Sequence, residues 1–278
     1  MPDSQDPNLA DSYLNDKDSI KNIVIVALSV CFVCAIVVSG AAVSLKPERM
    51  ANKALDRNKN ILIAAGLFEQ DVTQLREIDS LFEKFQIKIV DFEEQRFLSD
   101  VEAEAAGINA MTYDQRKAAK DPASSIALTK KVDIASIKRR ARYSVVYLLE
   151  KDGELDRIVL PVHGYGLWST LYGFIALEGD VNTVSGITFY EQQETAGLGG
   201  EVDNPAWKAL WPGKTIYNSD HKFSLRVIKG TVNPNSPNAN FQVDGLSGAT
   251  LTSRGVENLV AYWLGDNAFG PILKDLEG

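Results

Sequence analysis

Cysteine and histidine are scarce in this chain, which has two of each among 278 residues. Both cysteines, Cys31 and Cys34, lie inside an apolar segment, so a disulfide framework is excluded. A C-x-x-C pair can be a redox or metal motif, but the flanking sequence favours two small apolar residues of a membrane helix. His163 and His221 have no ligand partner at the usual spacing, and we therefore expect no metal site.

The chain also has no excess of positive charge. It contains 29 Lys and Arg residues against 37 Asp and Glu residues, and its net charge is −8. No nucleic-acid partner is therefore expected, since nucleic-acid-binding domains are usually basic. The chain also lacks the phosphate loop of P-loop proteins, the dinucleotide fingerprint between a strand and a helix, and the nucleophile elbow G-x-S-x-G. We expect neither nicotinamide binding by this chain nor catalytic residues of its own.

One long apolar run, residues 22–45, contains no charged residue. As a helix it would be about 36 Å long, enough to cross a bilayer. A cleaved signal peptide is the alternative, with small residues at Gly40 to Ala42 as a cleavage site, but its apolar core would be only about 7–15 residues after a basic leader. The leader here is acidic. We therefore expect a polar tail over residues 1–21 and a retained transmembrane helix over 22–45.

The orientation of this span is less clear from charge. Two lysines precede it, whereas five basic residues follow it closely (Lys46, Arg49, Lys53, Arg57 and Lys59). The positive-inside rule would place the large domain in the cytoplasm, but the rule is weak when a long domain follows the span.

The rest of the chain predicts an α+β fold with a mainly antiparallel sheet and flanking helices. Residues 46–140 form a membrane-proximal, helical or mixed region, with one short strand at 87–92 and a helix or connection within 100–135. Residues 141–278 form the second domain, with hairpin turns at Asp152-Gly153 and around residues 180–183. Short strands at 223–230 and 240–243 precede a last amphipathic helix that stops near residue 265.

A cluster of basic residues between 130 and 142 is expected to be a solvated face. The alternative is a contact with an acidic partner or with lipid headgroups. Its members are Lys130, Lys131, Lys138, Arg139, Arg140 and Arg142.

The segment from Asp244 to Arg254 reads D-G-L-S-G-A-T-L-T-S-R, between the last short strand and the last helix. Its small residues leave the backbone open, and the start of the following helix would direct free N–H groups and a positive dipole end at the turn. These features suit a phosphate group, with Arg254 as counter-charge. Hydroxyl residues at a helix start are also ordinary N-caps, so the pattern alone does not indicate a flavin.

This segment resembles the flavinylation motif that ends in [ST]-G-A-T, on which a flavin transferase esterifies FMN through its phosphate to the last threonine. That residue is Thr250 here, and Asp244, Ser247, Gly248 and Ala249 match the other positions. Thr252 is the nearest rival acceptor.

Three upstream segments extend the resemblance: 164–168 (G-Y-G-L-W), 191–202 (E-Q-Q-E-T-A-G-L-G-G-E-V) and 204–207 (N-P-A-W). Together with the flavinylation motif they are similar to the NqrC family of the sodium-translocating NADH:quinone oxidoreductases, which is related to the RnfG family of the Rnf electron-transport complex. Ala196 departs from the pattern, because the family version has proline there.

The resemblance implies an electron relay in a bacterial inner-membrane complex, with FMN on Thr250 passing electrons to the next flavin on the way to ubiquinone. The other subunits and the flavin transferase would be partners, and the large domain would be periplasmic because the transferase works outside the cytoplasm. An Rnf-type protein and a non-flavinylated anchored scaffold are the alternatives. The resemblance assigns to the cofactor site Thr250, Ser247, Gly248, Ala249, Leu251, Thr252, Trp168, Glu194, Thr195, Gly197, Leu198 and Gly199.

Overall fold

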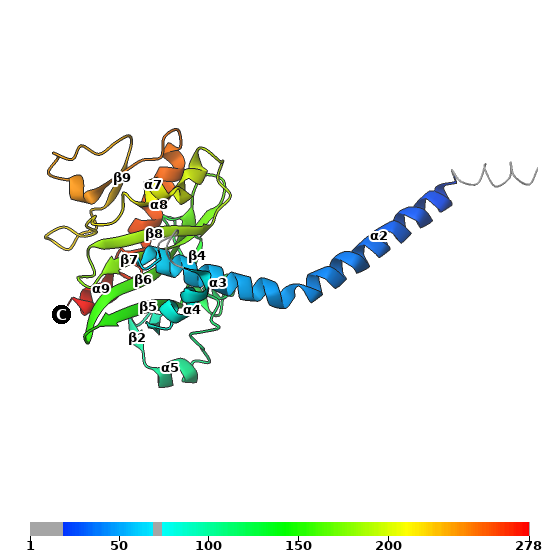
Figure 1. Ribbon diagram of the computed structural model, residues 1–278, viewed down its shortest axis with the longest axis horizontal. Coiled ribbons are helices and arrows are strands. Elements are labelled where there is room, and N and C mark those ends of the chain that lie inside the picture. Colours follow the sequence, from blue (N-terminus) through cyan, green and yellow to red (C-terminus); the bar gives the residue numbers. More distant parts are fainter. Residues whose placement is uncertain (1–18, 69–73, 278) are drawn as a thin grey trace, which may run out of the picture. The chain divides into compact units, whose positions relative to one another are not determined.

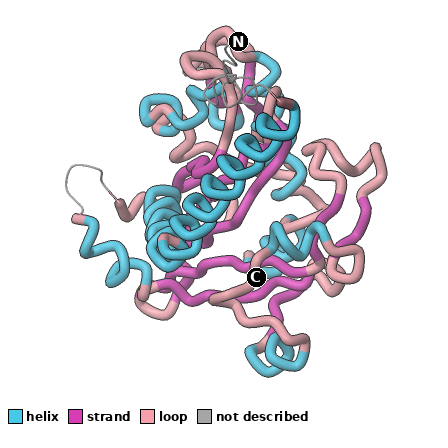
Figure 2. The backbone as a smooth tube through the Cα atoms, turned by 90° about the vertical axis from the view of Figure 1, so that its right-hand side faces the viewer, coloured by secondary structure: helices cyan, strands magenta, loops and turns pink. Residues whose placement is uncertain are grey.

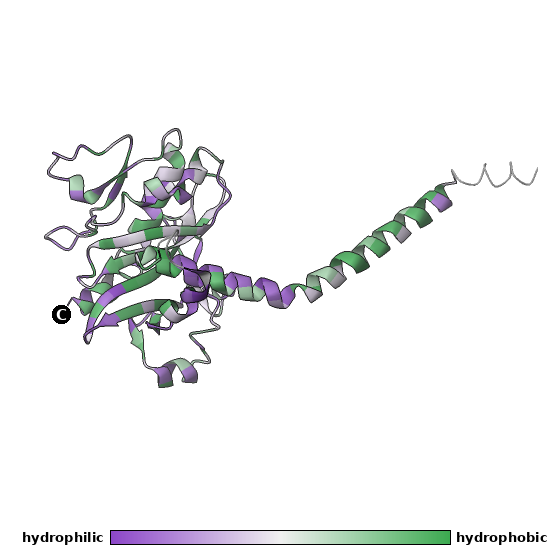
Figure 3. Cartoon of the chain, viewed as in Figure 1, coloured by the Kyte–Doolittle hydropathy of each residue, from purple (hydrophilic) through white to green (hydrophobic). Residues whose placement is uncertain are grey.

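The computed structural model describes residues 19–68 and 74–277 and divides the chain into two units, residues 1–54 and 55–278. In the first unit, α2 (Ile20–Ser44) has no buried residue and is capped by Ser19, whose side chain accepts a hydrogen bond from the Asn22 amide. With a mean hydropathy of 2.9, α2 is long and apolar enough to cross a membrane (Figure 3). Its bounds lie within two residues of the predicted 22–45. Helix α3 (Lys46–Ala64) follows and ends in the second unit.

The second unit is built on one six-stranded sheet in the order β2-β1-β5-β6-β7-β8, in which every neighbouring pair is antiparallel (Figures 1 and 2). The predicted α+β class with an antiparallel sheet is thus confirmed. The strands are β1 (Phe85–Asp91), β2 (Arg96–Leu98), β5 (Tyr143–Lys151), β6 (Glu154–Tyr165), β7 (Thr170–Glu178) and β8 (Val184–Glu191).

Both predicted hairpin turns are present. Asp152 and Gly153 join β5 to β6 with φ angles of 56° and 86°, the left-handed pair that a two-residue turn requires. Between β7 and β8, the Asp180 carboxylate accepts hydrogen bonds from the Asn182 and Thr183 amides at 3.0 and 2.7 Å. These local bonds set the register of the long strands.

The sheet crosses the boundary expected at residue 140. All seven residues of β1 pair with β5, so the segment before residue 140 supplies two strands of the sheet. The expected strand at 87–92 is β1, which begins two residues earlier at Phe85. The compact unit begins at Leu55 rather than at residue 141.

Between β2 and β5 lie short elements in a region whose sequence is only weakly patterned. Helix α5 (Asp100–Ala105) begins with a capping box between Ser99 and Glu102, and α6 (Gln115–Lys120) is capped by Asp114. Strand β3 (Ser125–Ala127) pairs with β4 (Arg139–Ala141) in a separate two-stranded sheet. Upstream, η1 (Leu75–Glu77) and α4 (Ile78–Phe82) lead into β1.

The C-terminal part places one long helix between shorter elements. Strands β9 (Arg226–Ile228) and β10 (Gln242–Asp244) pair in parallel in a separate two-stranded sheet. Helix α8 (Thr250–Trp263) packs tightly on β6, since a Cβ at Gly164 would lie 2.5 Å from the Leu259 Cβ. The remaining elements are η2 (Gly199–Asp203), α7 (Pro205–Lys208), η3 (Ala239–Phe241) and α9 (Gly270–Leu276).

Alternation along the strands divides the buried side chains between two cores. On β6, Ile158 and Leu160 belong to the core that contains α8 and α9, whereas Val159 belongs to the core that contains α3 and α4. Such alternation is the period-two pattern of a sheet covered on both faces. A hydrogen bond also joins α3 to β8, because the side-chain oxygen of Asn60 accepts one from the buried Thr188 hydroxyl at 2.8 Å.

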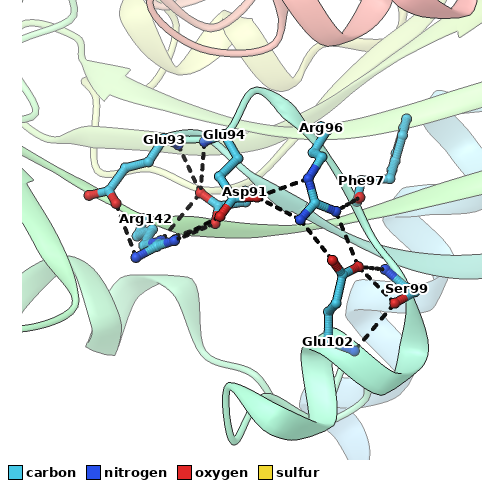
Figure 4. Close-up of polar contacts among 8 residues, drawn as sticks. All are labelled: Asp91, Glu93, Glu94, Arg96, Phe97, Ser99, Glu102 and Arg142. Carbon is cyan, nitrogen blue, oxygen red and sulfur yellow. Dashed lines mark hydrogen bonds and ion pairs between the residues drawn. The ribbon is translucent and has the colours of Figure 1, made fainter.

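A charged network closes the β1–β2 hairpin (Figure 4). Asp91 is 1% exposed, and its carboxylate accepts hydrogen bonds from the Arg142 guanidinium at 2.7 Å and from the Glu93 amide at 2.8 Å. Burial raises the pKa of Asp91, but these bonds together outweigh burial and lower it. The carboxylate is therefore ionised and anchors the start of β5 to the end of β1.

The ring of His163 predicts a pH dependence of stability. It stacks on Tyr172 with ring centroids 5.4 Å apart and lies 4.8 Å from the Trp263 ring. Burial, together with the positive charge of Arg116, lowers the pKa of His163 from its usual 6.5 to about 4. The native state therefore holds the neutral ring, so this stabilisation is complete above the unfolded pKa and is lost as pH falls toward 4.

We expect unfolding of the full chain in detergent to cost up to about 3 kcal/mol less at pH 4 than at pH 7 through this group. The His163→Phe variant should lose that part of the pH dependence, whereas His221→Phe, at an exposed position, should keep it. Equal pH dependence in wild type and His163→Phe would contradict the assignment.

Candidate functional site

Thr250 is the first residue of α8 and is exposed. The residue before it, Ala249, occupies the N-cap position and offers no side-chain hydrogen bond to the first turn. Gly248 adopts a φ of 72°, which lets the chain turn into the helix without strain. A hydroxyl therefore stands in solvent at a helix N-terminus whose first amides have no side-chain cap.

Thr252 lies in the opposite environment. Its side chain is buried, with 1% of the residue exposed, and its hydroxyl donates a hydrogen bond to the Glu194 carboxylate at 2.8 Å. Ser253, also buried, accepts a hydrogen bond from the Leu246 amide at 2.9 Å. The hydroxyls of this turn thus divide into exposed ones at Ser247 and Thr250 and buried, hydrogen-bonded ones at Thr252 and Ser253.

Glu194 joins the helix to the loop between β6 and β7. Its Oε1 accepts hydrogen bonds from the amides of Leu167, Trp168 and Ser169 at 3.1, 2.9 and 3.0 Å. Burial raises the pKa of Glu194, but the bonds from the Trp168 amide, Thr252 and the other amides outweigh burial and lower it. The carboxylate is charged although only 9% of the residue is exposed.

Two glycines make room for this carboxylate. A Cβ at Gly166 would lie 2.7 Å from Glu194 Oε1, and a Cβ at Gly199 would lie 2.6 Å from Thr252 Oγ1 and 2.8 Å from Glu194 Oε2. A side chain at either position would therefore displace the Glu194 carboxylate or the Thr252 hydroxyl from its present place.

Large apolar side chains are exposed around this corner. Trp168 is 68% exposed and Leu251 54%. Leu198 lies against the turn before α8, since a Cβ at Gly248 would be 2.9 Å from Leu198 Cδ2. Tyr165, the last residue of β6, and Leu167, on the loop that Glu194 binds, are also exposed. Exposed apolar groups gathered at one place on a soluble domain mark a binding surface.

On another side of Thr250 lies a small cleft of about 220 Å³. Thr250, Arg254 and Lys229 line it, and both basic side chains are exposed. Glu257 also lines the cleft, but its carboxylate is held by Arg226 at 2.6 Å and by the Val227 amide at 3.0 Å. The cleft therefore offers two cations to a negatively charged group.

Asp244, the first residue of the motif, has a structural role. Its carbonyl accepts a hydrogen bond from the Trp207 indole at 2.8 Å, and its carboxylate accepts one from the Val232 amide at 2.9 Å. The N-P-A-W segment thus places Trp207 under the turn, because Asn204 caps the short helix α7 that carries it.

The structure brings most of the predicted site residues together. The Glu194 carboxylate points into the 167–169 loop, whose amides it binds. The amides of Leu198 and Gly200 donate hydrogen bonds to the Thr195 carbonyl at 3.1 and 2.9 Å. Thr195, Gly197 and Leu198 are exposed, whereas Gly199 is buried.

Sequence reasoning missed Lys229, Tyr165 and the exposed side chain of Leu167. The last two belong to the G-Y-G-L-W segment, whose sequence does not show which of its side chains are exposed. Lys229 is 21 positions from Thr250, and only the parallel pairing of β9 with β10 brings it to the cleft.

Comparisons with known proteins identify the family of this chain. Residues 166–265 match the family model described as the FMN-binding domain. The NqrC protein of the Na(+)-translocating NADH-quinone reductase of Pseudomonas aeruginosa is 52% identical over 94% of this chain and 97% of its own length. Its counterpart in Yersinia pestis is 40% identical over 96% of each chain.

Two solved structures of NqrC proteins are also similar to this chain. The crystal structure of Shewanella oneidensis NqrC superposes with a TM-score of 0.71 and 34% identity, covering 81% of this chain and 99% of that one. The counterpart from Parabacteroides distasonis, at 24% identity and a TM-score of 0.59, shares the fold. The chain belongs to the NqrC family of the Na(+)-translocating NADH-quinone reductases.

Proposed function

We propose that this chain is an electron-relay subunit that carries FMN in phosphoester linkage to Thr250. The observation that carries the proposal is the contrast between the two threonines of the A-T-L-T turn. Thr250 presents an exposed hydroxyl at an uncapped helix N-terminus, whereas the Thr252 hydroxyl is buried and bound to Glu194. A transferase needs access to the oxygen that it modifies, and of these two threonines only Thr250 offers it.

The residues around Thr250 fit a phosphate group. The first amides of α8 point toward the N-terminus, where the helix dipole favours negative charge. Lys229 and Arg254 line the adjoining cleft and supply positive charge. A phosphoester on Thr250 would thus meet hydrogen-bond donors and cations.

The exposed apolar side chains fit an isoalloxazine ring. Trp168, Leu198 and Leu251 can cover its apolar faces, and their present exposure removes any need to open the core. Bound FMN supplies one- and two-electron redox chemistry, and the protein holds the ring and sets its surroundings. A surface position suits a relay, because partner redox groups can approach the ring.

The assignment of this chain to a membrane-bound complex rests on its family. The relatives' name describes a Na(+)-translocating NADH-quinone reductase, and we infer that this chain passes electrons within such a complex toward ubiquinone, with its other subunits as partners. Helix α2 would anchor the chain in the bacterial inner membrane. The domain would be periplasmic, where the flavin transferase that modifies Thr250 works.

The test is the intact mass of the purified full chain after export and co-expression with a flavin transferase, followed by peptide mapping. An added mass equal to FMN less one water, on the peptide that contains Thr250, is the expected result. An unmodified chain, from cells in which a second flavinylated protein is modified, would leave a membrane-anchored scaffold instead.

A further inference from the structure

We propose that Glu194 is a positioning residue that ties the flavin-carrying turn of α8 to the 167–169 loop and keeps a fixed negative charge beside the ring. The proposal rests on the proposed function, because it concerns the same cofactor. It gives Glu194 a different role from that of a ring-lining side chain.

The first argument is connectivity. One carboxylate joins three segments that are distant in sequence: its own loop after β8, the loop that follows β6, and the first turn of α8. Trp168 and Leu251, the two most exposed apolar side chains of the corner, each belong to or adjoin a residue that Glu194 binds. Their relative positions therefore depend on this one group.

The second argument is electrostatic. Among residues 19–68 and 74–277, the donors to the Glu194 carboxylate are neutral amides and hydroxyls, from Leu167, Trp168, Ser169 and Thr252, and no cation is paired with it. The pKa of the carboxylate lies below its ordinary value, so the charge persists at neutral pH. Because a reduced flavin carries more electron density than an oxidised one, a fixed anion nearby favours the oxidised form.

The variants are Glu194→Gln, which keeps the shape and removes the charge, and Thr252→Val, which removes only the bond to α8. Thr252→Ser should restore that bond. Glu191→Gln is the matched control, since it removes one carboxylate three residues away, on an exposed side chain paired with Arg116.

Two readouts on the full chain in detergent micelles separate the two parts of the idea. In the unflavinylated chain, hydrogen exchange of the amides at 167–169 should be faster by roughly tenfold in Glu194→Gln, which corresponds to the loss of a charge-assisted hydrogen bond. In the flavinylated chain, the ratio of reduced to oxidised FMN at a fixed potential should rise by roughly tenfold in Glu194→Gln and stay near wild type in Glu191→Gln.

Unchanged exchange and an unchanged flavin potential in a folded Glu194→Gln chain would overturn the proposal. If Thr252→Val leaves the exchange at 167–169 at the wild-type rate, Glu194 fixes the loop through its own bonds to the loop amides. If Thr252→Val makes the exchange faster and Thr252→Ser reverses this change, the bond between Glu194 and α8 also fixes the loop. If wild type carries no flavin, the proposed function fails, while the exchange experiment still decides whether Glu194 holds the loop.

Discussion

Replacing Thr250 with alanine is expected to remove covalently bound FMN completely, whereas replacing Thr252 with valine leaves the adduct in place. The reason is the access of the transferase to the hydroxyl. Thr250 is exposed at the first position of α8, whereas Thr252 is 1% exposed and its hydroxyl donates a hydrogen bond to Glu194. Yellow colour that survives denaturation, and the mass of the chain, report the adduct directly.

The controls separate acceptor chemistry from folding. Thr250→Ser keeps a hydroxyl at the same place and should still accept FMN. Thr250→Ala should unfold at the wild-type denaturant concentration, because an exposed first-turn side chain contributes little to stability. An adduct that persists in Thr250→Ala and disappears in Thr252→Val would move the attachment site and contradict the assignment.

The second large effect concerns stability and uses two tryptophans in opposite environments. Trp263 is 0% exposed, donates a hydrogen bond to the His163 carbonyl at 2.6 Å and contacts the Phe92 and Phe269 rings. Trp263→Ala should lower the free energy of unfolding by about 3–5 kcal/mol, because it leaves a cavity where α8 meets the sheet and leaves that carbonyl without its donor.

Trp168→Ala is the matched variant, because the same side chain is removed from a position that is 68% exposed. Its free energy of unfolding should stay within about 0.5 kcal/mol of wild type. Denaturant unfolding of both variants, followed by circular dichroism, measures the difference. Similar losses in the two variants would mean that the exposed loop contributes to stability in a way that its burial does not indicate.

Local signals in the sequence predicted what local physics determines. The Asp152-Gly153 turn, the helix over α8 and the apolar run of α2 follow from backbone preferences and hydrophobic periodicity. The segments of the site were found by resemblance to a family, and the structure brings Glu194, Leu198 and Thr252 to one corner.

Pairing over long distances could not be read in the same way. Strand β1 joins β5 more than fifty residues later, and β9 lies parallel to β10 because the intervening loop returns the chain to the same side. Neither choice leaves a local trace, since an apolar strand fits several neighbours equally well. The partners of Glu194 could not be predicted for a related reason: they are mostly backbone amides, which nearly every residue type possesses.

The corner around Glu194 depends on two residues without side chains, Gly166 and Gly199. Every replacement of a glycine adds at least one carbon, and at Gly166 and Gly199 that carbon would fall 2.7 and 2.6 Å from polar oxygens. Any other residue at either position must therefore displace the Glu194 carboxylate or the Thr252 hydroxyl. Evolutionary variation should accumulate at the rim instead, where exposed leucine and tryptophan side chains can be exchanged one at a time while the corner stays fixed.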